Sequence, residues 1–270
     1  MKLVLQEIFL GVYKFLTNSN YRRFLYLATI YGTRKRFHST QISFLNYSLN
    51  VPDCQSFIWQ FKEIFVDEYY RFESNSENPV IFDCGANVGT SCLYFKKLYP
   101  GSRITAFEAN LDIAKLLDEN LRNNGIDDVR LLNKAVWINS EGLELGLESA
   151  DGSSIHKKLN RVKVESIRLR DYLDKEEQID MLKMDIEGAE VDVLIDCKES
   201  LFKVRNLFVE FHSYRNEKQR LSEIIDILES NKFRYFIKQP EDRPRPLINR
   251  YNKSNPEIDL QLNIFAYRID

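Results

Sequence analysis

Three side chains that could take up or release a proton stand at the ends of two strand-like segments. Asp185 follows the segment DMLKM, and Glu210 and His212 close the segment NLFVEFH. Open α/β folds bind their ligands at the carboxyl ends of neighbouring parallel strands. We therefore expect Asp185, Glu210 and His212 to converge on one acceptor group, with His212 as the general base and a carboxylate that orients it.

The same side chains could instead hold Mg²⁺ or Mn²⁺ if oxygen ligands dominated the site. The sequence around them contains no dense cluster of Asp and Asn residues. Glu187 and Glu190 crowd further carboxylates around Gly188, but acidic residues are also favoured where a helix begins. We therefore expect a site without a metal ion, and a divalent cation is the less favoured alternative.

A loop of small residues follows a third strand-like segment. The stretch VIFDCGANVG places Asp83 at the end of the strand, with Gly85 and Gly89 after it. Because glycine has no side chain, a ligand can lie against the backbone here. The G-x-x-x-G spacing has neither the third glycine of a dinucleotide fingerprint nor the lysine of a phosphate loop. The loop is therefore expected to bind a ligand by groups other than phosphate.

A carboxylate after the next strand-like segment supplies the second half of this pocket. Glu108 follows the segment RITAF, and a carboxylate in this place can accept hydrogen bonds from two ribose hydroxyls. A ribose-binding carboxylate beside a loop without phosphate contacts indicates an adenosine-type cofactor, S-adenosylmethionine. We expect Asp83 to orient the amino-acid portion of this cofactor. Asn87 either holds the cofactor's carboxylate or stabilises the turn.

Six short motifs follow one another along the chain. They are DCGANVG at 83–89, FEAN at 107–110, LLDENLRNNG at 116–125, NKAVW at 133–137, LKMDIEGAE at 182–190 and VEFH at 209–212. In this order they resemble the FkbM-type branch of the class I S-adenosylmethionine-dependent methyltransferases. The resemblance covers roughly the C-terminal three quarters of the chain. It implies that Ala135 and Val136 lie beside the adenine of the cofactor.

Strand-like and helix-like segments alternate from Val80 onward. This alternation predicts a Rossmann-like α/β fold, in which helices cover both faces of a mostly parallel sheet. The expected strands are 80–83, 103–107, 129–133, 180–184, 206–211, 233–237 and 262–268. The resemblance implies that the last of these seven strands inserts antiparallel beside the fifth.

The chain is expected to have two parts, an N-terminal extension at 1–75 and a methyltransferase domain at 76–270. Within the extension, residues 1–36 are expected to be helical and residues 37–51 to form a hairpin, followed by an aromatic-rich helix at 56–65. The extension could cap the active site or form the interface of a homodimer.

The composition excludes several classes of protein. The formal net charge of -2 gives no general attraction to nucleic acid. No apolar stretch approaches the eighteen or so residues that a membrane span requires. The four cysteines lack the CxxC spacing of a metal or redox site. We therefore expect free buried thiols and a cytoplasmic protein.

Together these features predict an S-adenosylmethionine-dependent O-methyltransferase. The resemblance implies that the acceptor is a small molecule or glycan, with the methylated hydroxyl on a saccharide, a glycolipid or a related metabolite. One alternative is an N-methyltransferase or a methyltransferase of another small metabolite, which would share every cofactor motif. A second alternative is a non-catalytic binding protein that keeps the fold.

Overall fold

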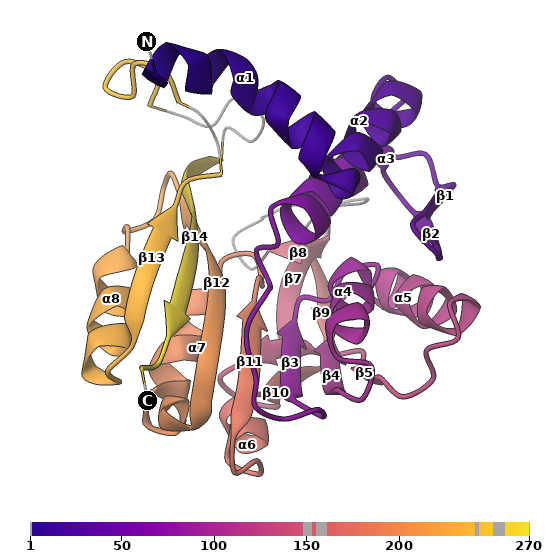
Figure 1. The fold of residues 1–270 in the computed structure, drawn as a ribbon. Coiled ribbons are helices and arrows are strands. Elements are labelled where there is room, and N and C mark those ends of the chain that lie inside the picture. The colour runs from indigo at the N-terminus through magenta and orange to yellow at the C-terminus, as the bar shows by residue number, and fades with distance from the viewer. Residues whose placement is uncertain (1, 148–152, 155–160, 241–242, 251–256, 270) are drawn as a thin grey trace.

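Seven strands form the central sheet of the computed structural model, which describes residues 2–147, 153–154, 161–240, 243–250 and 257–269 (Figure 1). In order across the sheet they are β13 (Arg234–Lys238), β14 (Ile258–Tyr267), β12 (Val204–Tyr214), β11 (Ile179–Met184), β3 (Val80–Cys84), β4 (Arg103–Phe107) and β5 (Arg130–Leu132). β14 runs antiparallel to both of its neighbours, and the other pairs are parallel. This confirms the seven strands expected from the sequence, including the antiparallel strand beside the fifth.

The two middle strands are buried along their whole length. Every residue of β3 and β11 is buried, as expected for parallel strands that are covered on both faces. Successive side chains of a strand point to opposite faces. Phe82 and Cys84 therefore join one apolar core, whereas Ile81 joins the other.

Helices that follow the strands cover both faces of the sheet (Figure 1). They are α4 (Thr90–Leu98), α5 (Leu111–Asn123), α6 (Arg170–Leu173), α7 (Glu190–Cys197) with the 3-10 helix Lys198–Lys203, and α8 (Leu221–Ser230). The helices α6, α7 and α8 pack on the face that carries Phe82, and α4 and α5 pack on the face that carries Ile81. The fold is the class I methyltransferase fold.

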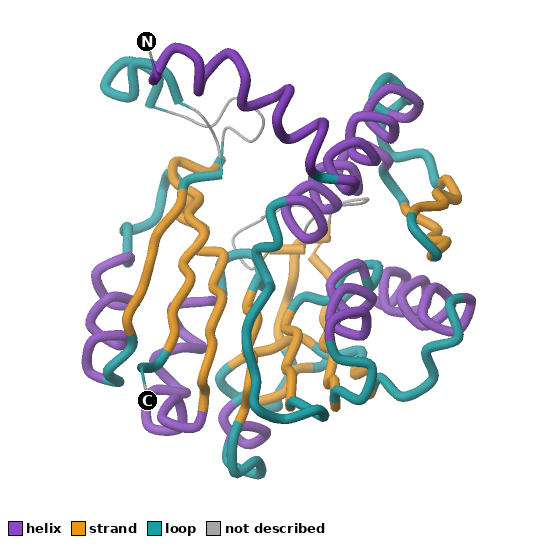
Figure 2. The backbone as a smooth tube through the Cα atoms, in the orientation of Figure 1, coloured by secondary structure: helices purple, strands orange, loops and turns teal. Residues whose placement is uncertain are grey.

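The N-terminal segment lies over one end of the sheet, as Figures 1 and 2 show. It contains α1 (Lys2–Thr17), α2 (Ser19–Tyr31), the hairpin β1 (Thr40–Phe44) and β2 (Tyr47–Val51), and α3 (Cys54–Phe61) with the π-helical turn Lys62–Val66. These elements match the expected helical segment, hairpin and aromatic-rich helix. The helix α3 reaches the carboxyl ends of the parallel strands, because both border the same cavity.

The N-terminal segment shares one apolar core with the sheet. Phe65 packs edge-on against Tyr94 of α4, with ring centroids 5.2 Å apart. The buried side chain of Asn120 on α5 adds a polar link, since its Nδ2 donates to Asn50 O at 3.0 Å and to Val88 O at 2.9 Å. One amide therefore connects the hairpin to the loop that follows β3.

The region between residues 135 and 168 contains short strands that the sequence did not predict. They are β6 (Ala135–Trp137), β7 (Leu143–Leu147), β8 (Ser153–Ser154), β9 (Arg161–Val164) and β10 (Ser166–Arg168). β6 pairs with β10, and β7 pairs with both β8 and β9. Strands this short show little alternation, and β9 is exposed along most of its length, so no hydrophobic pattern marks it.

The structure can be compared with the expectations about cysteines, a dimer interface and membrane spans. All four cysteines are free and buried, as expected. Leu10, Tyr13 and Leu16 of α1 are apolar and exposed, and a homodimer interface in this region stays a prediction. Among the described helices, none is long and apolar enough to cross a membrane.

Candidate active site at the carboxyl edge of the sheet

A cavity of about 290 Å³ lies at the carboxyl ends of the parallel strands. Small-molecule sites usually measure roughly 300–1,000 Å³, so this cavity is at the lower end of the range. Eight of the ten predicted site residues line it: Gly85, Asn87, Glu108, Ala135, Val136, Asp185, Glu210 and His212. These eight belong to a larger set of lining residues, and the other two predicted residues, Asp83 and Gly89, do not line the cavity.

The two glycines of the first loop are needed by the protein itself. Both have a positive φ, +82° at Gly85 and +94° at Gly89, which glycine adopts without strain. A Cβ at Gly85 would lie 1.8 Å from the backbone oxygen of Asp185, and a Cβ at Gly89 would lie 2.7 Å from Leu117 Cδ1. Protein atoms, rather than a ligand alone, thus exclude a side chain at both positions.

Glu108 holds the first loop in place. Its carboxylate accepts hydrogen bonds from the backbone N–H groups of Asn87 at 3.0 Å and Asn110 at 2.9 Å. Burial raises the pKa of Glu108, and these two hydrogen bonds oppose the rise. The side chain of Asn87 accepts from Val88 N at 2.7 Å, so in this state it stabilises the turn.

Asp83 does not reach the cavity, because its side chain is buried beneath the loop. Ser91 Oγ donates to its carboxylate at 2.5 Å, and Lys183 Nζ lies 3.3 Å from Asp83 Oδ1. Lys183 does line the cavity, and it donates to the backbone oxygen of Gly85 at 2.6 Å. Asp83 therefore acts on the site through Lys183. The sequence analysis overlooked this lysine, although a charged residue inside a buried strand was the available signal.

Lys183 keeps its charge despite being buried. Burial alone would lower its pKa, but Asp83 and Asp185 raise the pKa above the ordinary value for lysine. The Lys183 ammonium lies 3.7 Å from Asp185 Oδ2. A fixed positive charge thus stands between the loop after β3 and the carboxylates after β11.

The wall of the cavity that β6 and β7 form is apolar. Ala135 and Val136 line the cavity from β6, and Leu143 and Leu145 of β7 add to this wall. Trp137 packs instead against the core beneath the sheet, as aromatic residues most often do. An apolar wall, a carboxylate suited to ribose and a loop of small residues together fit S-adenosylmethionine.

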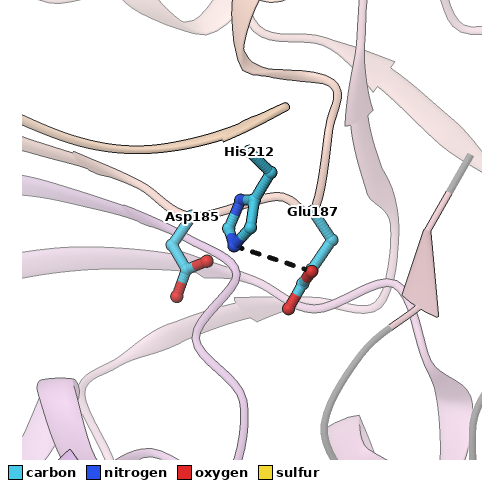
Figure 3. A group of neighbouring side chains, drawn as sticks. All are labelled: Asp185, Glu187 and His212. Atoms are coloured by element: carbon cyan, nitrogen blue, oxygen red, sulfur yellow. Dashed lines mark ion pairs between the residues drawn. The ribbon is translucent and has the colours of Figure 1, made fainter. Parts of the chain in front are cut away.

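Acidic groups and one histidine gather at the far side of the cavity. Figure 3 shows Asp185, Glu187 and His212 directed toward one another, and His212 Nε2 lies 3.8 Å from Glu187 Oε2. The same nitrogen lies 3.8 Å from Glu210 Oε1. His212 Nδ1 lies 3.2 Å from Glu190 Oε1, and Glu190 accepts from Gly188 N at 3.0 Å. The predicted convergence of Asp185, Glu210 and His212 on one cavity is present.

The crowding of carboxylates changes how these groups bind protons. Burial, followed by the charge of Asp185, raises the pKa of Glu210 to about 8. Burial alone would lower the pKa of His212, but Glu187 and Glu190 raise it well above the ordinary value. Burial and the charge of Asp185 also raise the pKa of Glu63, to about 7.

The N-terminal segment supplies a third wall that the sequence analysis did not assign to the site. Trp59, Gln60 and Glu63 line the cavity from α3 and the turn after it, and Tyr70 follows them. The Trp59 residue is 61% exposed. An aromatic-rich helix is most often part of a core, and nothing in its spacing marks Trp59 as a residue of the cavity.

Comparisons with known proteins identify the family of this chain. Residues 83–235, more than half of the chain, match the family described as the methyltransferase FkbM domain. The methyltransferase sdnD of Sordaria araneosa is 32% identical over 193 residues, which cover 56% of this chain and 73% of that protein. The 2-O-methyltransferase NoeI of Sinorhizobium fredii is 29% identical over 156 residues, which cover 50% of this chain and 63% of that protein.

One solved structure that is similar to this chain is that of the methyltransferase FkbM from Methylobacillus flagellatus. It is 14% identical, with a TM-score of 0.49, and the match covers 92% of this chain and 59% of that chain. The family assignment depends on the sequence match, which begins at Asp83 and includes the loop, Glu108 and the acidic cluster. The chain belongs to the FkbM methyltransferase family and is an S-adenosylmethionine-dependent methyltransferase.

Proposed function

We propose that this protein methylates a hydroxyl group of a saccharide, a glycolipid or a related metabolite. The observation that carries the proposal is the position of Asp185, Glu210 and His212 in the same cavity as Glu108. A hydroxyl is a poor nucleophile until its proton is removed, so an O-methyltransferase needs proton-accepting groups beside the acceptor. This cavity provides several of them.

The division of the cavity suggests a role for each wall. Glu108 and the Gly85 loop would hold the cofactor, and Lys183 would hold the loop in place beside the carboxylate of Asp185. When bound, S-adenosylmethionine supplies an electrophilic methyl group, so that an O–C bond forms as the C–S bond breaks and S-adenosylhomocysteine is released. Aligning the acceptor with that methyl group is the main task of the remaining residues.

Glu210 is the residue that we propose takes the hydroxyl proton. Its side chain is 16% exposed, whereas the His212 side chain is 3% exposed, so the carboxylate is the more accessible of the two to an acceptor. Gln261 donates a hydrogen bond to Glu210 Oε1 and orients the carboxylate. His212 is held between carboxylates and would support the arrangement from behind.

The wall from α3 favours a saccharide as the acceptor. Trp59 offers an exposed aromatic face, on which the C–H groups of a sugar ring can pack. Gln60 and Glu63 offer hydrogen-bonding groups beside it. The similarity to a protein named a 2-O-methyltransferase supports oxygen as the acceptor atom.

A transfer assay tests this proposal. The purified protein would be incubated with cofactor carrying a tritiated methyl group and a panel of saccharides, glycolipids and amines, with and without Mn²⁺. We expect tritium in hydroxyl-bearing products of one saccharide or glycolipid class. The Glu108→Ala variant serves as the control with weakened cofactor binding. Label that enters only amines would overturn the proposal of O-methylation.

A further inference from the structure

We propose that Asp185, Glu187 and His212 form a binding site for one divalent cation, and that Mn²⁺ is the ion that best suits them. The sequence favoured a site without a metal ion, because no dense cluster of Asp and Asn residues surrounds these side chains. The binding site itself does not depend on the proposed O-methylation. The role of the ion, which is to hold an acceptor hydroxyl, does rest on that function.

The geometry of the three side chains is the first argument. One donor atom from each residue lies within 4.8 Å of the donor atoms of the other two. Donors that bind one ion at about 2.0–2.2 Å lie at most about 4.4 Å apart. Small rotations of the Asp185 and Glu187 side chains, which are 28% and 29% exposed, would close the remaining gap. Figure 3 shows that all three point toward a common centre.

The environment of His212 is a second and independent argument. Its side chain is 3% exposed, and its Nδ1 lies 3.2 Å from the fully buried carboxylate of Glu190. A carboxylate behind the ring is the arrangement that orients a metal-binding histidine and directs its other nitrogen to the ion. Within the described part of the chain, Nε2 lies 3.8 Å from Glu187 and Glu210 and makes no hydrogen bond. A buried nitrogen thus faces two carboxylates.

The balance of charge is a third argument. Four carboxylates surround His212 or adjoin it, namely those of Asp185, Glu187, Glu190 and Glu210. Lys183 approaches Asp185 at 3.7 Å but is closer to Asp83, at 3.3 Å. Carboxylates that lie this close together repel one another. A divalent cation bound between Asp185 and Glu187 would reduce that repulsion.

The type of ion follows from the donors. Two carboxylates and one imidazole give a mixed oxygen and nitrogen set. Mg²⁺ strongly prefers oxygen donors, and Zn²⁺ favours histidine and cysteine in a tetrahedral arrangement. Mn²⁺ accepts carboxylates readily and takes an imidazole as well. Since three donors leave coordination positions open, and all three residues line the cavity, the hydroxyl of an acceptor can occupy one of them and become more acidic.

Direct measurement of Mn²⁺ binding tests the site without cofactor or acceptor. The protein would be treated with EDTA, dialysed and titrated with Mn²⁺, with the free ion followed by electron paramagnetic resonance. We expect one ion per chain. Asp185→Asn and Glu187→Gln should each weaken binding at least tenfold, and Glu190→Gln, which acts through His212, by roughly 10- to 100-fold. Asp226→Asn removes an exposed carboxylate of α8 and should bind Mn²⁺ as the unaltered protein does.

The possible results separate this proposal from the proposed function. No uptake of Mn²⁺, or uptake that is the same in Asp185→Asn and Glu187→Gln, would overturn the site. Displacement of Mn²⁺ by an equal concentration of Mg²⁺ would overturn the choice of ion. Tight Mn²⁺ binding without transfer to any hydroxyl would preserve the site and reject O-methylation. Thermal melting curves would confirm that each variant is folded.

Discussion

Lys183 and Asp83 face each other on adjacent parallel strands, with Lys183 Nζ 3.3 Å from Asp83 Oδ1 and both side chains buried. The pair lies directly beneath the Gly85 loop, to which Lys183 also donates a hydrogen bond. Removing one partner of a buried ion pair leaves an uncompensated charge. We therefore expect Asp83→Asn to lower the free energy of unfolding by about 3–5 kcal/mol, as measured by urea denaturation.

Two further variants test whether the loss of stability is specific to the buried ion pair. Asp118→Asn breaks a pair on the surface, in which Asp118 lies 3.0 Å from Arg122, and should change the unfolding free energy by about 1 kcal/mol or less. The double variant Asp83→Asn/Lys183→Met removes both buried charges and should recover much of the lost stability. If Asp83→Asn were as mild as Asp118→Asn, the buried pair would have no structural role.

Glu108 is expected to determine the affinity for the cofactor. Charge-assisted hydrogen bonds contribute about 1.5–3 kcal/mol each, so Glu108→Ala should weaken binding of S-adenosylmethionine by about 10- to 100-fold. Titration calorimetry measures this change, with Glu119→Ala on the exposed side of α5 as the control. Because Glu108 also binds two backbone N–H groups, melting temperatures must accompany the titration. Unchanged affinity in Glu108→Ala would remove this residue from the cofactor site.

We expect substitution of Gly89 to lower the stability of the fold, in addition to any effect on cofactor binding. A side chain here would meet Leu117 and would sit at φ +94°, a region that costs other residues about 1–2 kcal/mol. Gly89→Ala should therefore lower the unfolding free energy by at least that amount in urea denaturation. A fully stable Gly89→Ala variant would contradict the packing against α5.

His212 is expected to affect turnover and not cofactor affinity. His212→Ala should lower kcat by roughly 100-fold or more, because the acceptor hydroxyl would lose its activation. The dissociation constant for S-adenosylmethionine should stay the same. The sequence favoured a site that EDTA leaves unaffected, whereas the proposed cation site requires that EDTA inhibits and Mn²⁺ restores turnover. Full activity of His212→Ala would exclude this residue from catalysis.

Trp59 is expected to contribute to acceptor binding. Trp59→Ala should raise the KM for a saccharide acceptor by about tenfold, equivalent to about 1.4 kcal/mol, because the aromatic face at the cavity is lost. Trp59→Phe keeps an aromatic ring and should largely preserve the KM. Steady-state kinetics at saturating cofactor would measure both. Equal KM values in all three proteins would place the acceptor elsewhere in the cavity.

The sequence predicted the sheet well because its buried strands carry an unambiguous pattern. VIFDC and DMLKM are mostly apolar segments that are followed by an acidic residue or a loop of small residues, and such segments mark parallel strands and their functional edge. The strands between residues 135 and 168 were missed because each has five residues or fewer. These strands form because they pair with segments distant in the sequence, and the local sequence pattern carries no information about such pairing.

The site was predicted less completely, because the sequence does not show in which direction each side chain points. Asp83 and Lys183 occupy equivalent places on neighbouring strands, yet only Lys183 reaches the cavity. Glu187 resembled a helix-start residue, and only the folded turn directs it toward His212 (Figure 3). Trp59 comes from a helix far away in the sequence, so its place in the cavity depends on packing of the N-terminal segment over the sheet.

The double hydrogen bond from Asn120 has a consequence for how the chain can be divided. Asn120 is buried by the hairpin, and Phe65 covers Tyr94 in the same core. A fragment that starts at residue 76 would expose this aromatic surface and would leave part of the amide of Asn120 unpaired. We expect such a fragment to aggregate during expression, so the N-terminal segment would act as an obligatory folding partner of the catalytic sheet and not as a detachable module.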